Sequence, residues 1–319
     1  MAKKTQITIE LTDKEHLEMI DAMEEAGITR AEDYVKMLVS MATSSEIVQK
    51  MNKDLREAAD LMPKQEARFL VDLYYQFQKL RIHMNNQVSS MTLDVPEGKE
   101  EPCDILRHFA ANMAKMEKMA ESCLKRFVEN DEVGLWMTSN KGVGGILAAN
   151  ILANVDITKA VTAGAIYKFA GLDPTQEWKK GEKRPWNAKL KTACWKLGES
   201  FVKVSGKEDA FYGKLYREVK ERYQTKNDAG GFADRAKEGL EKYGKTTEAY
   251  QHCKEGHLPP AHINSMAKRY AVKMFLSHLH EVWWKHEFKA APVKPYAIAI
   301  LEHGHYIPVP NEPEWAKKY

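Results

Sequence analysis

The sequence predicts a mainly α-helical protein with one short strand, and three observations support this prediction. Hydrophobic residues make up 44% of the 319 residues and charged residues 29%, which is enough for folded cores rather than a disordered chain. From residue 46 onward, apolar residues recur at three- to four-residue steps, the period of an amphipathic helix. Strict alternation, the sign of a half-buried strand, appears in TQITIEL at residues 5–11. We therefore expect helices joined to one short strand.

Residues 1–45 predict a small head with the order strand, helix, helix. Thr12 with Glu15 and Thr29 with Glu32 have the spacing of capping boxes that open helices, and Gly27 ends the first of them. The strand has no partner nearby, and a single strand of this length does not form a stable sheet. We therefore expect two copies to pair their strands, which makes a homodimer or a higher even homo-oligomer.

Over residues 4–43 this order resembles a ribbon-helix-helix domain. The resemblance implies a two-stranded ribbon that enters the major groove of DNA. By position, side chains of the strand would face the bases, and backbone amides at the second helix would meet a phosphate; these residues are Gln6, Thr8, Glu10, Thr29 and Arg30. The head carries five Lys/Arg against nine Asp/Glu, so a module for dimerisation alone remains an open alternative.

Residues 46–130 predict a helical hairpin or a coiled-coil linker. Apolar residues at helical spacing continue to about residue 92, with a break expected at Pro63 because proline lacks the backbone N–H. LDVPEGKEEP at residues 93–102 has the composition of a loop, and a Met-rich helix is expected at 103–129. This region is expected to provide structure rather than chemistry.

A glycine-rich turn at KGVGG, residues 141–145, joins two predicted helices. It lacks the Gly-Lys-Ser/Thr end of a phosphate loop, and Leu147 stands where a dinucleotide fingerprint needs glycine. The pattern is typical of a helix-hairpin-helix, whose backbone N–H groups hold one DNA phosphate. The residues expected to do so are Lys141, Gly142, Gly144 and Gly145. The alternative is that small residues let two helices pack closely.

Positive charge is concentrated in residues 179–226, where fourteen Lys/Arg stand against six Asp/Glu. A basic block in a chain of net charge +3 indicates a polyanionic partner, although a solvated helix face remains the alternative. The cations expected to contact phosphates are Lys179, Lys180, Lys183, Arg184, Lys189 and Lys191. Trp178, Trp186 and Trp195 are interleaved with them, either as core residues or as platforms for unpaired bases.

The order of motifs over residues 66–288 resembles the C-terminal part of insertion-sequence transposases of the 110/116/902 group. The resemblance rests on the glycine turn, on FAGLDP at 169–174, on FYGKLYREVKERY at 211–223 and on AKRYAVKMFLSHLHEVWW at 267–284. It implies a transposase-like helical domain at residues 131–288, a mobile-element or phage context and DNA as the partner. The family's guide RNA makes RNA an alternative partner.

The sequence departs from that family where the family carries its catalysis. The family implies a resolvase-like domain with metal-binding acidic residues, for which the 45-residue head has no room, and a serine nucleophile after Gly-Leu-x-Pro. No serine lies between Ser139 and Ser200, and Thr175 is the one hydroxyl residue from 175 to 191. We therefore expect a DNA-binding protein derived from a transposase, with no catalytic residue. The alternatives are an active transposase or recombinase with an altered site or a partner's catalytic domain, and an oligomeric structural protein.

The remaining features predict neither a cofactor nor a metal site. Eight of the eleven histidines lie between residues 252 and 305, but the spacing around Cys253 matches no closed zinc site. Residues 289–319 predict a Pro-rich extended arm on the same or a neighbouring subunit. No apolar run approaches the roughly 20 residues that span a bilayer, so we expect a cytoplasmic protein without a membrane partner.

Overall fold

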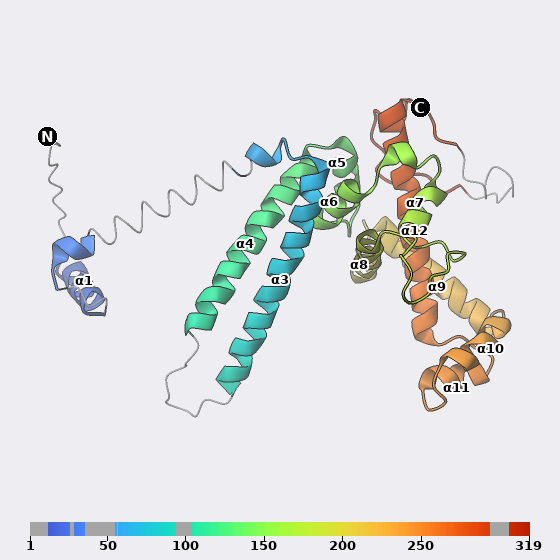
Figure 1. Cartoon of the computed structure of the whole chain (residues 1–319), viewed down its shortest axis with the longest axis horizontal. Coiled ribbons are helices and arrows are strands. Elements are labelled where there is room, and N and C mark those ends of the chain that lie inside the picture. The colour runs from blue at the N-terminus through green and yellow to red at the C-terminus, as the bar shows by residue number, and fades with distance from the viewer. Residues whose placement is uncertain (1–11, 26–28, 36–54, 56, 94–103, 294–305) are drawn as a thin grey trace. The chain divides into compact units, whose positions relative to one another are not determined.

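A computed structural model describes residues 12–25, 29–35, 55, 57–93, 104–293 and 306–319 (Figure 1). These residues are mainly helical and include no strand, which confirms the predicted mainly α class. The chain divides into two compact units, Met1–Glu57 and Ala58–Tyr319. The strand predicted at residues 5–11 lies outside the described part, so the ribbon remains a prediction.

The first unit contains helix α1, Asp13–Glu25, followed by a short helical stretch at residues 31–35. The backbone N–H of His16 donates to the carbonyl of Thr12 at 2.9 Å, and that of Tyr34 donates to the carbonyl of Arg30 at 3.2 Å. Both helices therefore begin close to the predicted start residues, within the one or two residues by which helix ends vary.

The second unit begins with an antiparallel hairpin of α3, Lys64–Leu93, and α4, Asp104–Glu129. Helix α3 starts directly after Pro63, which confirms the predicted break. The two helices bury Val71, Leu124 and Val128 at the end of the hairpin that adjoins the rest of the unit. The hairpin that the apolar period predicted is thus present.

The body of the second unit is built around its longest C-terminal helix, α12, Pro260–Phe288 (Figure 1). This helix packs against five other elements, and its Phe275 stacks 5.7 Å from Trp136 within a cluster of aromatic rings. These five are α5 (Glu132–Ser139), η1 (Ile157–Lys159), α7 (Ala163–Phe169), α8 (Ala188–Val204) and α9 (Phe211–Asp228). Helix α6 (Gly145–Asn154) packs between α8 and the hairpin. The helices predicted on both sides of the glycine turn and at 211–223 and 267–284 are all observed.

Two short helices form the insertion that follows α9. Helices α10, Ala233–Lys242, and α11, Glu248–Lys254, pack on each other, and Gly239 permits this because a Cβ there would lie 2.5 Å from the sulfur of Cys253. The side chain of Asn227 closes the insertion at its base. It accepts from the N–H of Leu258 at 2.8 Å and donates to its carbonyl at 3.1 Å.

Residues 306–319, the described part of the predicted arm, contact α5 and α12 of the same chain. The indole N–H of Trp136 donates to the carbonyl of Pro310 at 3.0 Å, and Lys285 on α12 pairs with Glu312 at 2.7 Å. The segment therefore joins α5 to α12. Among the helices that the structure describes, none is both long and apolar enough to cross a membrane.

Candidate nucleic-acid interface

The glycine turn between α5 and α6 is closed by contacts with α8. Gly142 has a φ of 98°, in the region that favours glycine, and a Cβ there would lie 3.0 Å from Val204 and 3.2 Å from Phe201. The hydroxyl of Ser200 donates to the carbonyl of Gly142 at 2.6 Å. Gly142 thus serves the close packing that was the alternative hypothesis for this turn.

The other residues of the turn differ in the room they leave for an anion. Gly144 is exposed with open space beside it, and α6 begins there without a side-chain cap, so its first N–H groups have no partner within the helix. Gly145 approaches α4 so closely that a Cβ would lie 2.8 Å from the side chain of Lys125. Lys141 already pairs with Asp209 at 3.2 Å. The geometry therefore serves packing and leaves phosphate binding as a hypothesis.

The segment from 175 to 187, which we call the basic loop, is ordered by its two tryptophans. The rings of Trp178 and Trp186 meet edge to face with centroids 6.4 Å apart, and Arg184 lies over Trp178 at 5.1 Å. The indole N–H of Trp178 donates to the carbonyl of Glu182 at 2.8 Å. These contacts hold the loop's cations in place without burying them.

Trp178 and Trp195 are not core residues, because 37% and 62% of their surface is exposed. Trp186 is half-buried beneath Lys191, whose ammonium lies 3.9 Å from the ring centroid. Exposed indoles among cations correspond to the second hypothesis for these tryptophans, as platforms for stacking.

The six cations predicted to contact phosphate are all exposed, but their environments differ. Lys189 at the start of α8 pairs with Asp72 of α3, which partly neutralises it. The N–H of Lys179 faces the Glu182 carboxylate at 3.4 Å. Within the described parts of the chain, Lys180 and Lys183 form no ion pair, so their charges face solvent. The list is completed by Arg184 and Lys191, which lie over tryptophan rings.

The glycine turn and the basic loop lie at opposite ends of α8. Gly142 contacts Phe201 and Val204 near the C-terminal end of this helix, whereas Asn187, at the end of the basic loop, caps its N-terminal end. The helix has 17 residues, so the two places are separated by roughly 24 Å. They do not form one local clamp, and a single ligand would have to extend along α8 to reach both.

In the head, the predicted DNA-facing residues are only partly described. Thr29 and Arg30 are exposed, and the Arg30 guanidinium pairs with Glu32 at 3.1 Å and with Asp33 at 3.8 Å. Its charge is therefore already shared with acidic neighbours. Three predicted residues lie outside the described part: Gln6, Thr8 and Glu10.

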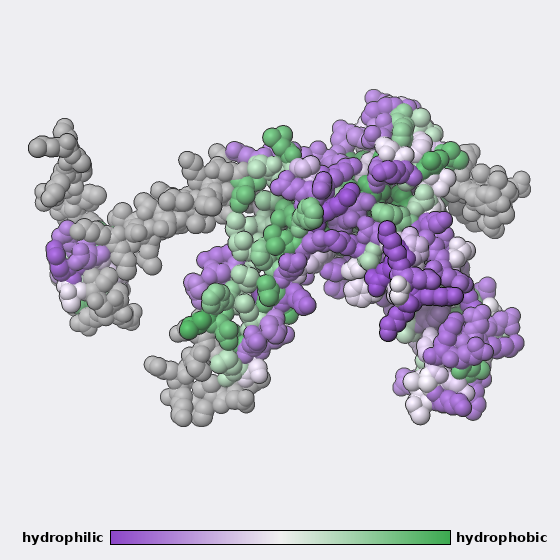
Figure 2. Space-filling view, viewed as in Figure 1, coloured by the Kyte–Doolittle hydropathy of each residue, from purple (hydrophilic) through white to green (hydrophobic). Residues whose placement is uncertain are grey.

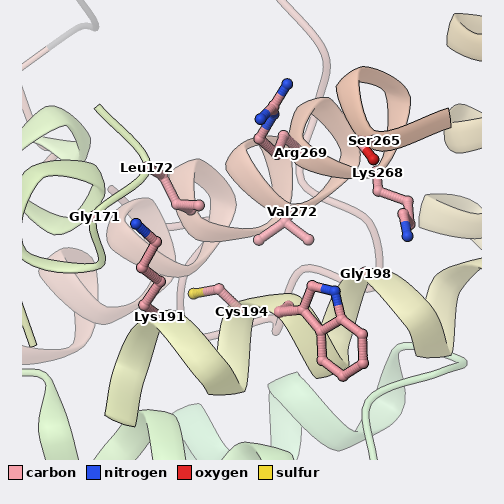
Figure 3. Close-up of a pocket in the computed structure, with 10 residues that line it drawn as sticks. Gly171, Leu172, Lys191, Cys194, Gly198, Ser265, Lys268, Arg269 and Val272 are labelled. Atoms are coloured by element: carbon pink, nitrogen blue, oxygen red, sulfur yellow. The ribbon is translucent and has the colours of Figure 1, made fainter. Parts of the chain in front are cut away.

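A pocket of about 310 Å³ opens between α8 and α12 (Figure 3). Its floor is apolar, and Figure 3 shows Lys191 rising from α8 and Arg269 from α12. The lining residues are Gly171, Leu172, Lys191, Cys194, Trp195, Gly198, Ser265, Lys268, Arg269 and Val272.

Two polar groups of the pocket are already engaged, and two cations are not. Lys268 pairs with Glu199, and the hydroxyl of Ser265 donates to the carbonyl of Ala261 at 2.8 Å. Lys191 and Arg269 form no ion pair within the described residues. Burial, and then the charge of Arg184, lower the pKa of Lys191. The lowering reflects chiefly the partial burial of the ammonium group.

The cations of α12 are the functional residues that we did not identify from the sequence. Arg269 and Lys273 are four residues apart, so they share one face of the helix, and Lys273 lies 5.4 Å from the ring of Tyr167. The i, i+4 spacing could have shown that they share a face. That Arg269 lines a pocket together with residues of α8, about eighty residues earlier in the chain, is a property of the tertiary fold.

Nucleophiles around the pocket are committed to structural bonds or held neutral. The hydroxyl of Thr175 donates to the carboxylate of Asp173 at 2.8 Å. Burial raises the pKa of the Cys194 thiol to about 12, so the thiol stays protonated at neutral pH.

The site as a whole offers exposed cations, exposed indoles and a small apolar pocket, a combination suited to an anionic aromatic ligand. Comparisons of the chain with protein-family models, with curated proteins and with solved structures gave no match.

Proposed function

We propose that this protein binds nucleic acid through the basic loop and the adjoining faces of α8 and α12. The observation that carries the proposal is the grouping of unpaired cations with exposed indoles. Lys180 and Lys183 face solvent without an acidic partner among the described residues, and Trp178 is exposed in the same loop. Trp195 is exposed on α8, where it lines a pocket with Lys191. Cations neutralise phosphates and indoles stack on bases, so the two groups together suit nucleic acid better than a simple anion.

The contacts we infer are to the phosphate backbone rather than to base edges. The basic loop presents exposed lysines and an arginine on a non-helical segment. Such contacts give affinity without sequence preference, and the affinity falls as salt rises because bound counterions are released. Recognition of a specific base sequence is instead expected from the predicted ribbon of the head.

DNA is the nucleic acid we favour, and we infer descent from a mobile-element transposase. The order of motifs over residues 66–288 supports this, as does the correspondence of the predicted helices with the observed ones. We propose a binding role without strand transfer, because the usual serine is missing and Thr175 is bonded to Asp173. Structured RNA is the alternative that the experiment below separates from duplex DNA.

The proposal is tested with the double variant Lys183→Glu/Arg184→Glu in a salt titration of fluorescence anisotropy. Probes are duplex DNA and a structured RNA. If both residues contact phosphates, binding weakens and the slope of log K against log salt becomes shallower by about 2. Failure of the wild-type protein to bind either probe at ~50 mM salt, where phosphate contacts are strongest, would contradict the proposal.

The matched control is Lys115→Glu/Lys118→Glu on α4. Both lysines are exposed, and both double variants change the net charge by the same amount, from +3 to −1. A general effect of net charge would weaken binding equally in the two variants. We expect the α4 variant to keep nearly the wild-type affinity, since its lysines lie outside the basic loop.

Assembly of several copies is a second candidate function, favoured by the outer surface of the hairpin. Apolar side chains gather along α3 and α4, whereas hydrophilic ones cover α10 and α11 (Figure 2). Phe69 is 65% and Ile105 75% exposed, and the others are Leu73, Leu80, Ile82, Met91, Phe109 and Met116. Apolar surface of this extent is typical of a protein interaction site.

A further inference from the structure

The pocket between α8 and α12 has a chemistry that phosphate contacts alone do not require. A surface that only binds a nucleic-acid backbone needs exposed cations, as the basic loop provides. The pocket adds an apolar floor made by Leu172, Val272 and the backbone of Gly198. An apolar hollow with cations at its rim suits a ligand that has both a flat ring and a negative charge.

The indole of Trp195 provides the stacking surface of this pocket. Its side chain lines the cavity although 62% of the residue remains exposed, so one face is open to a ligand. A buried core tryptophan gains stability from packing, and this one packs little. Stacking on an unpaired base is the contact that an exposed indole in a basic surface makes best.

Two cations of the rim are available for a phosphate group. Lys191 on α8 and Arg269 on α12 line the pocket from different helices, and Figure 3 shows the Arg269 guanidinium extending away from α8. Of the nearby acidic groups, Glu199 pairs with Lys268, whereas Asp173 accepts from the Thr175 hydroxyl and keeps its charge. Neither Lys191 nor Arg269 forms an ion pair among the described residues, so both can bind an anionic group.

The cavity has the size of one nucleotide unit. Its volume of about 310 Å³ lies at the lower end of the range for ligand pockets, roughly 300–1,000 Å³. A base pair or a dinucleotide is too large for it. Gly171 lines the pocket and leaves room for two neighbouring side chains, because a Cβ there would lie 3.0 Å from the side chain of Lys191 and 2.7 Å from that of Trp186.

We propose that this pocket receives one unpaired nucleotide of a bound strand, with its base stacked on Trp195 and its phosphate between Lys191 and Arg269. The inference rests on the proposed function and narrows it. The basic loop holds the backbone of any nucleic acid, and the pocket adds affinity for single-stranded segments, strand ends or bulges, whose bases are free to leave the stack.

The test compares an oligothymidine strand with an abasic strand of equal length, which carries the same phosphates without bases. The wild-type protein is expected to bind the oligothymidine about tenfold more tightly, as stacking of one base predicts. Trp195→Leu is expected to bind both strands equally, at the wild-type affinity for the abasic strand. Because Trp195 is exposed, the variant should fold, and its far-ultraviolet circular dichroism checks this.

Phe109→Leu is the control, since it removes an exposed aromatic ring of α4 that lies outside the basic loop and the pocket. It should keep the tenfold preference for bases. Arg269→Gln should weaken binding of both strands without removing the preference. If Trp195→Leu keeps the preference, or if Phe109→Leu abolishes it, the base does not stack in the pocket and the proposal is overturned.

Two further outcomes separate the pocket from the proposed function. Equal binding of the two strands by the wild-type protein would overturn the proposal that the pocket receives a nucleotide, and it would leave the proposal of nucleic-acid binding intact. Absence of binding to both strands and to duplex DNA would overturn both proposals. Thymidine monophosphate is the probe for a free nucleotide: if it binds more tightly than the strand, the pocket serves a free nucleotide and the proposal for a bound strand fails.

Discussion

Gly171 shows how a single residue determines the shape of the candidate site. Its φ is 64°, in the left-handed region where residues with a Cβ are strained by roughly 1–2 kcal/mol. The position after α7 therefore turns the chain back toward α8, and the missing Cβ leaves room for Trp186 and Lys191. The predicted motif FAGLDP contained this glycine, but its contacts with the pocket were not evident from the sequence.

His278 gives the protein a predicted pH dependence at the scale of one residue. Its Nδ1 accepts from the hydroxyl of Tyr212 at 2.8 Å and its Nε2 donates to the carbonyl of Ile307 at 3.0 Å, which requires the neutral ring. Burial lowers the pKa of His278 in the folded state. Above about pH 6.5, the ordinary pKa of histidine, the ring is neutral in both the folded and the unfolded chain. Below about pH 6.5 the unfolded chain binds the proton more readily than the folded chain does.

We therefore expect the free energy of unfolding to fall as pH decreases from about 6.5, the ordinary pKa of histidine. Urea denaturation at a series of pH values measures this. His278→Gln should reduce the pH dependence, and the part that remains is expected from His280 and His262, whose pKa values are also lowered chiefly by burial. His83→Gln, at an exposed position on α3, is the control and should retain the wild-type pH dependence.

At the scale of elements, α3 and α4 are joined by a polar cluster around Glu117. The buried carboxylate of Glu117 on α4 accepts from Arg81 at 2.5 Å and from Gln78 at 3.1 Å, both on α3. These bonds lower the pKa of Glu117, chiefly through Arg81, and keep it ionised. The cluster selects one register of the two helices, because a shift by one turn would leave the charges unpaired.

Glu117→Ala should destabilise the second unit by about 1–3 kcal/mol. Loss of one partner from a fully buried ion pair costs more than about 3 kcal/mol, because the other charge stays buried without a partner. The effect here should be smaller because the side chain of Arg81 is 31% exposed and can reach water. Glu117→Gln should cost less because it retains hydrogen bonds. Urea denaturation measures both, with Lys118→Ala at the exposed neighbouring position as the control. Equal effects of Glu117→Ala and the control would show that the cluster adds no stability.

At the scale of the whole molecule, the chain consists of two units that are each compact, Met1–Glu57 and Ala58–Tyr319. The basic loop and the pocket belong to the second unit, as do the exposed apolar residues of α3 and α4, which we call the apolar stripe. The predicted ribbon belongs to the first. Two modes of assembly are thus proposed on separate units, so a truncation separates them.

A chain of residues 58–319 should unfold with the same transition as the second unit in the full-length protein, because that unit contains its own core. Sedimentation equilibrium of both proteins then identifies the element of assembly. If the ribbon pairs the subunits, the full-length protein is dimeric and the truncated one monomeric. Dimers of the truncated chain would instead point to the stripe on α3 and α4. Loss of the cooperative transition would contradict the independence of the unit.

The sequence by itself determined the features that depend on neighbouring residues. The helical period, the break at Pro63, the turn at Gly142 and the concentration of cations at 179–191 all correspond to structure, because periodicity, proline and glycine act over a few residues. Only the tertiary structure decided which side chains share a site. It placed the glycine turn and the basic loop at opposite ends of α8, left Trp195 exposed, and brought Arg269 to the pocket. These results depend on the packing of helices distant in sequence, and no local pattern encodes that packing.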